Sequence, residues 1–470
     1  MASHADLHAL LNPRAVAVIG ASSRSGQVGG VVLARLLEGG RPVYPVHPDE
    51  SEVCGIRTVP SVDALPDGVD LAVIAVGAAR AVEAAEACAR LGIAHLLVIA
   101  AGFAETGAAG RALQERLAAL PGRHPTRILG PNTLGLHVPH TRLSTLFVEH
   151  APELLARGGG VAFVTQSGSV GVEAVGLAAN IGFGLRAFVG LGNKCDLDEV
   201  DFLEHFAADP GTTCLAFHLE NLDCGRRFLE AAATASRRKA VVVLKAGRTP
   251  AGAAAASLHT GRLAGSDRVV DGAFRQFGIL RAADDEALCD AARTLAALPL
   301  PRGPRVGIIT PAGGYGVMAA DQVETPPERG AARLALASLA GATRERIRAA
   351  TPPFASADNP VDLTAVADDA MFAAALDALL DDDAVDIVLC GAFFAAHGVT
   401  DGLVDVLAEH VRGARKPILA FTLYGPKTER YLRRLHEAGV VGFPSVARVV
   451  RAARVLVQRA GLLDAPGGAR

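Results

Sequence analysis

The chain of 470 residues has no tryptophan, and aromatic residues make up only 4% of it. Its charges nearly balance, with 46 Lys and Arg against 49 Asp and Glu. This disfavours a nucleic-acid-binding role, because such proteins carry a net basic field. With so few aromatic residues, we expect Val, Leu, Ile and Ala to fill the cores. The length and an apolar content of 50% predict a globular protein of roughly two to four domains.

Metal-binding and membrane-directing patterns are also missing. The seven cysteines form no C-x-x-C pair or other metal-ligand spacing, so we expect reduced thiols and no metal site on this chain. No apolar run reaches the roughly 18 residues of a membrane helix. The N-terminal residues lack the basic and apolar segments of a signal peptide. These absences predict a cytoplasmic protein that does not cross a membrane.

Short β-branched runs alternate with alanine-rich stretches along the chain. This alternation predicts an α/β fold, in which parallel sheets are covered by helices on both faces. A proline-rich linker at residues 298–304 marks one boundary. We expect one such domain in each of residues 1–145, 146–300 and 301–465. The expected strands are Ala15–Ile19, Val43–Val46, Leu71–Val76, Leu96–Ala100, Arg127–Leu129, Gly160–Val164, Gly184–Val189, Cys214–Leu219, Ala240–Leu244, Gly278–Leu280, Arg305–Ile309, Val385–Leu389 and Pro417–Phe421.

A glycine-rich turn follows the first expected strand of each domain, in residues 20–30, 165–171 and 310–317. Ligands of parallel sheets bind beyond the carboxyl ends of the strands, and helix N-termini there attract phosphate. The first turn does not fit G-x-G-x-x-G, and the second strand ends at Val46 without an acid at its tip. Asp49 lies one residue past a proline and is a poor substitute. A ligand held mainly through phosphates is therefore favoured over a nicotinamide dinucleotide.

His259 lies in a polar, glycine-punctuated segment, residues 257–267, that we expect to form a loop. A neutral imidazole is a nucleophile, and Gly261 lets the backbone approach a ligand closely. Such a segment suits a phosphoryl group. Glu220 follows the strand that ends at Leu219, and a carboxylate that reached His259 would fix its tautomer. Lys245 and Arg248, at the end of the next strand, are further candidates for neutralising an anion, with a solvated surface role as the alternative.

Taken in order, the motifs resemble the ADP-forming acetate–CoA ligase family, which is related to succinyl-CoA synthetase. Any one motif is weak, but the ordered set covers nearly the whole chain. The motifs are Gly20-Ala-Ser-Ser, Ile99-Ala-Ala-Gly102-Phe103, Gly130-Pro-Asn-Thr-Leu-Gly135, Thr165-Gln-Ser-Gly168, Leu191-Gly-Asn-Lys194, Leu244-Lys-Ala-Gly-Arg248, Ser257-Leu-His-Thr-Gly261 and Asn359-Pro-Val-Asp-Leu363. The resemblance implies a Rossmann-like CoA-binding domain followed by two flavodoxin-like, succinyl-CoA synthetase-like domains.

The resemblance also implies roles for individual residues. His259 is similar to the histidine that is transiently phosphorylated, and Glu220 to the acid that orients it. The residues implied in phosphate binding, at two helix starts and beside the histidine, are Ser167, Gly168, Ser169, Gly261, Gly313, Gly314 and Gly316. The residues implied in CoA binding are Gly20, Ala21, Ser22, Gly26, Val46, Ala101, Gly102, Phe103 and Asn132.

The implied reaction interconverts acyl-CoA, inorganic phosphate and ADP with a carboxylic acid, CoA and ATP through the phosphohistidine. Phosphoryl transfer of this kind depends mainly on positioning and charge neutralisation. No ATP-grasp region is seen in the sequence. We therefore expect an alpha-type subunit in a hetero-oligomer, whose ATP-grasp beta subunit binds ATP or ADP and Mg²⁺.

Three departures from the family pattern stand out. Leu258 precedes the histidine where the family usually has a small residue, and Arg262 stands where the family usually has serine. Asp49 stands about where relatives often carry a basic residue near CoA. The run at residues 325–327, Thr-Pro-Pro, should end the preceding helix early, because proline lacks an amide hydrogen and clashes with the preceding turn.

Two other functions remain open from the sequence. One is a non-catalytic CoA or acyl-CoA sensor that has lost its partner, and the other is an NAD-dependent oxidoreductase. The retained His259, Glu220 and glycine turns favour the enzyme. The acyl group is not determined by the motifs, since acetate, a branched or aryl acid, or a dicarboxylate all fit.

Overall fold

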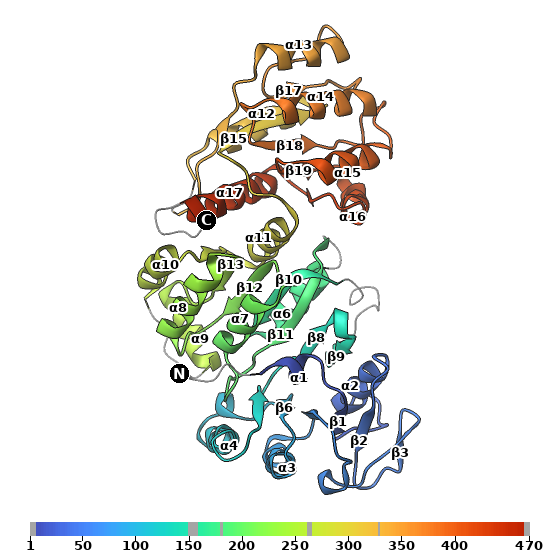
Figure 1. Ribbon diagram of the computed structural model, residues 1–470, viewed down its shortest axis with the longest axis vertical. Coiled ribbons are helices and arrows are strands. Elements are labelled where there is room, and N and C mark those ends of the chain that lie inside the picture. Colours follow the sequence, from blue (N-terminus) through green and yellow to red (C-terminus); the bar gives the residue numbers. More distant parts are fainter. Residues whose placement is uncertain (1–5, 149–157, 179–181, 261–265, 328–329, 465–470) are drawn as a thin grey trace. The chain divides into compact units, whose positions relative to one another are not determined.

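The computed structural model describes residues 6–148, 158–178, 182–260, 266–327 and 330–464 (Figure 1), without the side chains of residues 256–260. The chain divides into two compact units. The first unit consists of residues 1–176 and 184–288, and the second of residues 177–183 and 289–470. The first unit contains two large sheets and a two-stranded hairpin at residues 52–57, and the second unit contains one large sheet. The three large sheets are called the first, second and third sheet.

The first sheet is parallel and five-stranded, in the order β2-β1-β5-β6-β7. Every residue of β1, β5 and β6 is buried, as expected of apolar strands that are covered on both faces. The strands are β1 (Val16–Ile19), β2 (Val43–Val46), β5 (Leu71–Ile74), β6 (His95–Val98) and β7 (Arg127–Leu129). The connecting elements are α2 (Val28–Leu37), the hairpin β3 (Glu52–Val53) and β4 (Ile56–Arg57), η1 (Val62–Ala64), α3 (Ala78–Arg90), η2 (Ala104–Thr106) and α4 (Ala108–Ala118).

The second sheet has seven strands in the order β14-β13-β12-β10-β11-β8-β9. Its strands are β8 (Leu136–Val138), β9 (Leu143–Ser144), β10 (Gly158–Thr165), β11 (Leu185–Gly190), β12 (Cys214–Leu219), β13 (Ala240–Lys245) and β14 (Leu280–Arg281). β8 pairs antiparallel with β11 and with β9, and the other pairings are parallel. The associated helices are η3 (Pro139–Thr141), α6 (Gly168–Leu177), α7 (Glu199–Ala208), α8 (Gly225–Ser236), α9 (Pro250–Thr260) and α10 (Asp267–Gln276).

The third sheet, in the second unit, is parallel and runs β16-β15-β18-β19-β20, with β17 also paired to β15. Its strands are β15 (Arg305–Thr310), β16 (Ala335–Leu336), β17 (Val361–Asp362), β18 (Ile387–Gly391), β19 (Ile418–Phe421) and β20 (Gly442–Phe443). The helices of this part of the chain are α11 (Asp285–Ala297), α12 (Gly313–Glu324), α13 (Gly341–Ala350), α14 (Asp369–Asp381), α15 (Leu403–Gly413), η5 (Gly425–Lys427), α16 (Thr428–Glu437) and α17 (Val446–Asp464).

All three sheets share one feature of strand order. In each sheet the chain adds later strands on both sides of the first long strand, so the direction of strand addition reverses there. Thus β1 lies between β2 and β5, β10 lies between β11 and β12, and β15 lies between β16 and β18. This reversal leaves a crevice beyond the carboxyl end of that strand, where ligands of open α/β sheets bind. The mostly parallel α/β fold that the sequence predicts is confirmed.

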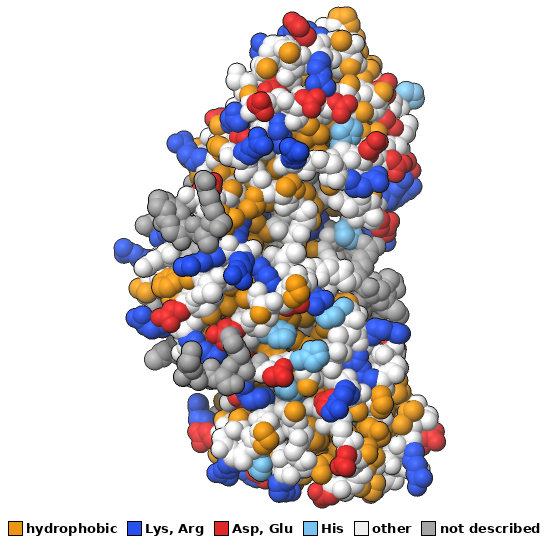
Figure 2. Space-filling view, viewed as in Figure 1, with side chains coloured by type: hydrophobic (Ala, Val, Ile, Leu, Met, Phe, Trp, Pro, Cys, Tyr) orange, Lys and Arg blue, Asp and Glu red, His pale blue; other side chains and the backbone are white. Residues whose placement is uncertain are grey.

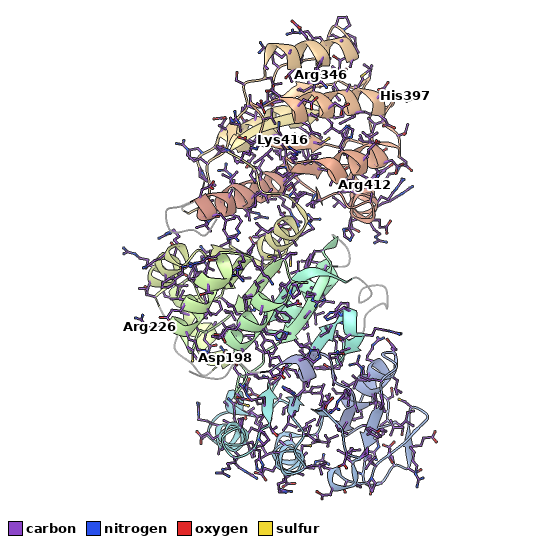
Figure 3. The ribbon with its side chains drawn as sticks, viewed as in Figure 1. Asp198, Arg226, Arg346, His397, Arg412 and Lys416 are labelled. Carbon is purple, nitrogen blue, oxygen red and sulfur yellow. The ribbon has the colours of Figure 1, made fainter. Side chains whose placement is uncertain are left out.

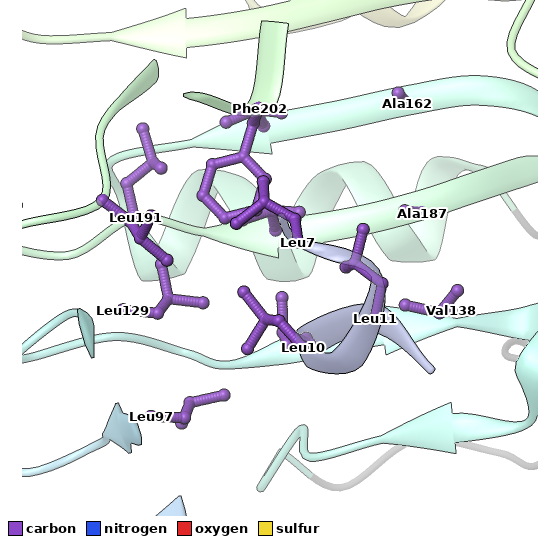
Figure 4. Packing of buried hydrophobic residues seen from close by; sticks show 14 of the residues in the cluster. Leu7, Leu10, Leu11, Leu97, Leu129, Val138, Ala162, Ala187, Leu191 and Phe202 are labelled. Carbon is purple, nitrogen blue, oxygen red and sulfur yellow. The ribbon is translucent and has the colours of Figure 1, made fainter. Parts of the chain in front are cut away.

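The short helix α1 (His8–Leu11) packs inside the core that the first two sheets share. The side chains of Leu7 and Leu10 are fully buried and Leu11 is 6% exposed. Figure 4 shows these leucines between Leu97 and Leu129 of the first sheet and Phe202 of α7. Burying a leucine side chain contributes about 1.5–3 kcal/mol. This apolar packing joins the two sheets of the first unit.

The predicted strands are present, with ends shifted by a few residues. Two short strands, β8 and β9, precede residue 145 in the sequence but belong to the second sheet. The division at residues 145 and 300 therefore stays a proposal. The early helix end expected before the two prolines is confirmed, since α12 ends at Glu324. The loop expected from residue 257 is wrong in part, because the alanine run continues α9 to Thr260.

A local sequence signal accounts for the start of α7. Asp198, labelled in Figure 3, begins α7 with a capping box, since its side chain accepts the amide hydrogens of Val200 and Asp201.

All seven cysteines are free thiols. Within the described ranges, no helix is long and apolar enough to span a membrane. The face in Figure 2 shows basic and acidic side chains interspersed, in keeping with the balanced composition.

A buried carboxylate ties α11 to α17 in the second unit. Asp290 is 1% exposed, and Arg448 donates to both of its oxygens at 2.8 Å through Nε and Nη2. Arg293 and Arg451 approach the same carboxylate at 3.7 and 3.9 Å. Burial lowers the pKa of Arg293 to about 10. One carboxylate thus offsets the charge of several guanidinium groups.

The variant Asp290→Asn should destabilise the second unit by about 3 kcal/mol, because it removes one member of a buried charge cluster. Urea unfolding followed by circular dichroism would measure the loss. The exposed Asp405, replaced by Asn, is the matched control and should stay within about 0.5 kcal/mol of wild type. Equal stabilities of the two variants would contradict this role for Asp290.

Candidate functional site

The turn after β1 brings α2 close to the end of its strand. Gly20 has a φ of +86°, and a Cβ there would lie 2.5 Å from Val76 Cγ1. A Cβ on Gly29 would lie 2.1 Å from the carbonyl oxygen of Gly20, so α2 can come this close to the turn only because position 29 has no side chain. Gly26 also has a positive φ, +78°, but open space beside it. This turn therefore needs glycine for backbone reasons whether or not a ligand binds.

The segment after β2 supplies a residue that the sequence reasoning missed. Glu50 accepts a hydrogen bond from the Ser22 hydroxyl at 2.8 Å and from the Ser23 amide at 2.9 Å. The sequence pattern pointed only to Asp49, which is nearer to the expected strand tip. The acid that meets the turn comes four residues after Val46, the end of β2. Ala21, between the turn's other predicted residues, is buried.

A cavity of about 530 Å³ lies between the first and second sheets of the first unit. It unites the predicted CoA residues Ala101 and Asn132 with the predicted phosphate residues Ser167, Gly168 and Ser169. The remaining lining residues are Val28, Ala75, Val76, Gly77, Ile99, Ala100, Thr133, Leu134, Phe147 and Gln166. The cavity is thus built from the carboxyl ends of strands in both sheets.

Gly102 and Phe103 do not line this cavity. Phe103 is fully buried, and Gly102 has a φ of +104°. The amide hydrogens of both residues are donated to Glu105 Oε1, at 2.7 and 3.1 Å. Their contribution is therefore to hold the backbone beside Ala101 in place.

A polar network fixes Asn132 at the junction of the two sheets. Asn132 has a φ of +59°, and its Nδ2 donates to Asn193 Oδ1 at 3.3 Å. Asn193 in turn donates to Glu105 Oε2 at 2.6 Å and to Gln114 Oε1 at 2.9 Å. Hydrogen bonds of the Glu105 carboxylate lower its pKa against the opposing effect of burial. Asn193 belongs to the motif Leu191–Lys194, but sequence spacing does not predict the contact of Asn193 with Glu105.

The turn after β10 is folded around the hydroxyl of Thr165. This hydroxyl accepts the Ser167 amide hydrogen at 3.1 Å and donates to the Ser167 carbonyl at 3.0 Å. The hydroxyls of Ser167 and Ser169 lie 3.1 Å apart, and no atom would crowd a Cβ on Gly168. The Ser167 hydroxyl also accepts the Val170 amide hydrogen at 3.4 Å, and both serines line the cavity at the start of α6, where the helix dipole favours an anion.

Glu220 is positioned by Gln166, which belongs to the motif Thr165–Gly168 but is not among the predicted site residues. Gln166 Oε1 accepts the amide hydrogens of Glu220 and Asn221 at 2.5 and 3.0 Å. On the other side, Lys245 Nζ donates to the Glu220 carbonyl and to the Ala246 carbonyl, both at 2.7 Å. Burial is the main cause of a lowered pKa at Lys245. Lys245 thus fixes backbone at the strand end.

Lys194 also bonds the segment that follows β12. It is 6% exposed, and its Nζ lies 2.9 Å from Glu199 Oε2 and 3.3 Å from the Asn221 carbonyl oxygen. His218, one strand position before Leu219, is buried and lies 3.2 Å from the Thr165 hydroxyl through Nδ1. Burial lowers the pKa of His218. These residues connect the Thr165 turn to the end of β12.

The backbone of His259 lies in the last turn of α9, and its side chain is among those outside the description. Gly261 lies outside the described residues altogether. The helix α9 lies beside η2, which follows the Ala101–Phe103 segment of the first sheet. The helix that carries His259 is therefore near the junction of the two sheets, but the contact between His259 and Glu220 stays a prediction.

The second unit repeats the geometry of the Thr165 turn at the end of β15. Thr310 Oγ1 accepts the Ala312 amide hydrogen at 3.1 Å and lies 3.3 Å from the Ala312 carbonyl oxygen. The predicted residues Gly313, Gly314 and Gly316 form the first turn of α12. A Cβ on Gly313 would lie 2.6 Å from Asp362 Oδ2, and one on Gly314 would meet open space.

The two turns also share a packing glycine. A Cβ on Gly171 would lie 3.1 Å from Thr165 Cγ2, and one on Gly316 would lie 3.2 Å from Thr310 Cγ2. In both helices the glycine lets the first turn sit directly on the threonine that ends the strand. The side chain of Asn359 supports the backbone around it. Its Oδ1 accepts the Ile308 amide hydrogen, and its Nδ2 donates to the carbonyl oxygens of Val306 and Ala337.

Three family models match consecutive parts of the chain. A CoA binding domain matches residues 14–139, a succinyl-CoA ligase like flavodoxin domain matches residues 158–295, and a ligase-CoA domain matches residues 306–459. The cavity described above lies where the first two of these regions meet. Fold and site together define the class of acid–CoA ligases.

Similar proteins narrow the class to one family. The alpha subunit of ADP-forming acetate–CoA ligase II from Pyrococcus furiosus is 36% identical over 96% of this chain and 97% of its own length. ADP-forming acetate–CoA ligase I from Archaeoglobus fulgidus is also 36% identical, over 95% of this chain and 63% of its own length. The chain belongs to the ADP-forming acyl-CoA synthetase family and is of the alpha-subunit type.

A solved structure agrees with this membership. The dinucleotide-forming acetyl-coenzyme A synthetase 1 of Candidatus Korarchaeum cryptofilum, in complex with phosphate and ADP, matches with a TM-score of 0.88 and 33% identity. The match covers 97% of each chain. The similarity therefore extends over both units and not only over the CoA-binding region.

Replacing Gln166 with Ala should destabilise the first unit by about 2 kcal/mol, because the amide hydrogens of Glu220 and Asn221 lose their acceptor. Thermal unfolding would measure the change. Gln322, on α12, replaced by Ala, is the control for loss of a glutamine side chain. A Gln166→Ala protein as stable as the control would contradict the positioning role of Gln166.

Stability should fall as the pH is lowered from 7.5 to 5.5. Burial lowers the pKa values of His95, His205 and His218 in the folded chain, so below about pH 6.5 the unfolded chain binds protons more readily. Urea midpoints across this window would show the decline, and His218→Gln should flatten it. The exposed His397, labelled in Figure 3, is the control variant. A flat profile in the wild type would contradict this expectation.

Proposed function

We propose that this chain is the alpha subunit of an ADP-forming acyl-CoA synthetase. It interconverts acyl-CoA, inorganic phosphate and ADP with a carboxylic acid, CoA and ATP. The single observation that carries the proposal is the cavity in which Ala101 and Asn132 face Ser167–Ser169. A thioester held at the first sheet and a phosphate held at the second would meet there.

The residues of the first sheet fit the CoA half of the reaction. The cavity begins at Val28, the first residue of α2, and continues along Ala75–Gly77 and Ile99–Ala101 to Asn132. This path follows the carboxyl ends of three neighbouring strands, as a long, phosphate-bearing ligand requires. The predicted residues Gly20, Ala21, Ser22 and Gly26 belong to the turn that leads into α2, and Val46 ends β2. We propose that they bind the phosphates of CoA, although they do not line the cavity itself.

The start of α6 fits the phosphoryl half. Ser167 and Ser169 offer hydroxyl groups beside an uncrowded Gly168, and a helix N-terminus contributes about 0.3–1 kcal/mol toward an anion at the surface. Inorganic phosphate attacks the acyl carbon, the C–S bond breaks, and the products are an acyl phosphate and CoA. His259 then takes the phosphoryl group and releases the carboxylic acid.

Glu220 orients the imidazole of His259 in this proposal. Its backbone is fixed by Gln166 on one side and Lys245 on the other, so its carboxylate starts from a defined position. A carboxylate beside a catalytic histidine selects the tautomer and stabilises the charged ring.

Gly313, Gly314 and Gly316, in the first turn of α12, are proposed as the second phosphate-binding helix start.

A partner completes the reaction. We propose an ATP-grasp beta subunit that binds ADP or ATP with Mg²⁺ and accepts the phosphoryl group from His259. The relative from Archaeoglobus fulgidus, of which this chain spans 63%, supports a further nucleotide-binding region. The complex is a cytoplasmic hetero-oligomer, and acetate or another small carboxylic acid is its substrate.

Phosphorylation of His259 tests this function. Acyl-CoA and labelled inorganic phosphate should produce an acid-labile protein phosphate in the wild type and none in His259→Ala. Glu220→Gln should lower the labelling rate by about 100-fold, as loss of an acid–base partner does. The label and its acid lability would be followed by gel and scintillation counting.

The exposed His397, replaced by Ala, is the matched control and should be labelled as well as the wild type. The same proteins would be tested with ATP and the co-purified beta subunit. A wild-type chain that carries no label from either supply would overturn the proposed function.

A further inference from the structure

The turn after β1 already holds a carboxylate. Glu50 lies in the segment between β2 and β3. These two strands are labelled at the lower right of Figure 1. The Ser22 hydroxyl donates to its Oε1 at 2.8 Å, and the Ser23 amide donates to its Oε2 at 2.9 Å. Each oxygen of the carboxylate therefore occupies one hydrogen-bond donor of the turn.

Glu50 is also held from its own side. Its amide hydrogen is donated to His47 Nδ1 at 2.9 Å, and its carbonyl accepts the Thr58 hydroxyl. Because Nδ1 accepts, the ring proton of a neutral His47 is on Nε2, which lies 3.6 Å from Glu50 Oε1. Hydrogen bonds from Ser23 and then Ser22 lower the pKa of Glu50 to about 2. The group is thus charged at neutral pH.

A phosphate would use the same donors. Backbone amides and hydroxyls before a helix bind carboxylates and phosphates in the same way. The turn leads into α2, whose N-cap residue, Gln27, makes no side-chain capping bond. The next residue, Val28, lines the cavity between the two sheets. A phosphate that approaches Ser22 and Ser23 therefore meets a like charge that is already bonded there.

We propose that Glu50 sets the affinity of this turn for CoA: its carboxylate occupies the phosphate-binding donors, so that CoA binds there by displacing it. The proposal rests on CoA binding by the first sheet, as proposed above. Displacement breaks the hydrogen bonds to Ser22 and Ser23 and returns the carboxylate to water. The affinity for CoA is therefore lower than the turn itself would give.

Calorimetry with the full-length chain tests this role. Glu50→Gln keeps the shape and removes the charge, and it should bind CoA about 10-fold more tightly than wild type. Glu50→Ala vacates the donors and should bind CoA at least as tightly as Glu50→Gln. Both variants should unfold at a lower temperature than wild type without ligand, because the carboxylate stabilises the empty turn.

Glu52→Gln removes the same charge from an exposed position on β3 and should change CoA affinity less than twofold. Pantetheine, which has no phosphate, should bind wild type and Glu50→Gln alike. If Glu50→Gln binds CoA as the wild type does, or more weakly, the inference is overturned while CoA binding stands. Absence of CoA binding in every protein would overturn the proposed function and this inference with it.

Discussion

The site depends on one constraint of parallel sheets, the reversal of strand order beside the first long strand. Each of the three sheets has this reversal, and each places a glycine turn and a helix start in the crevice it leaves. In the second and third sheets, the threonines that end β10 and β15 hold the turn through their hydroxyls. The same device thus recurs in both compact units.

The cavity further depends on how the first two sheets are joined. Leu10 and Leu11 of α1, with the adjacent Leu7, fill the apolar space between them. At the edge, Asn132 is hydrogen-bonded to Asn193, which is hydrogen-bonded to Glu105. Because β8 and β9 belong to the second sheet, the chain crosses the junction before it begins β10. A shift of either sheet would separate Asn132 from Ser167, so packing remote from the cavity sets its geometry.

Electrostatics is arranged with few basic side chains. Lys194 and Lys245 are buried and bonded to carbonyl and carboxylate oxygens of the chain, so they brace strand ends. In the proposed function, anion binding falls to hydroxyls, amides and helix starts, which carry partial charges. Such groups can position a phosphoryl group and stabilise its charge, which is what phosphoryl transfer requires.

The sequence by itself determined the fold class, the strands and the family. Apolar runs of β-branched residues predict buried parallel strands, and an ordered set of motifs is specific where each motif alone is not. It also marked Ala101, Asn132 and Ser167, which the structure brings to one cavity. The loop expected from residue 257 was wrong in part, because an alanine run propagates a helix past the polar residues that follow it.

Only the tertiary structure decided which residues meet. Glu105 and Asn193 lie 88 positions apart, and Gln166 and Glu220 lie 54 apart, so no spacing rule connects them. The occupation of the first turn by Glu50 was likewise hidden, since a carboxylate four residues past a strand reaches that turn only through the path of the intervening loop. Local sequence dictates local structure through propensity and burial, whereas these contacts arise from the packing of distant segments.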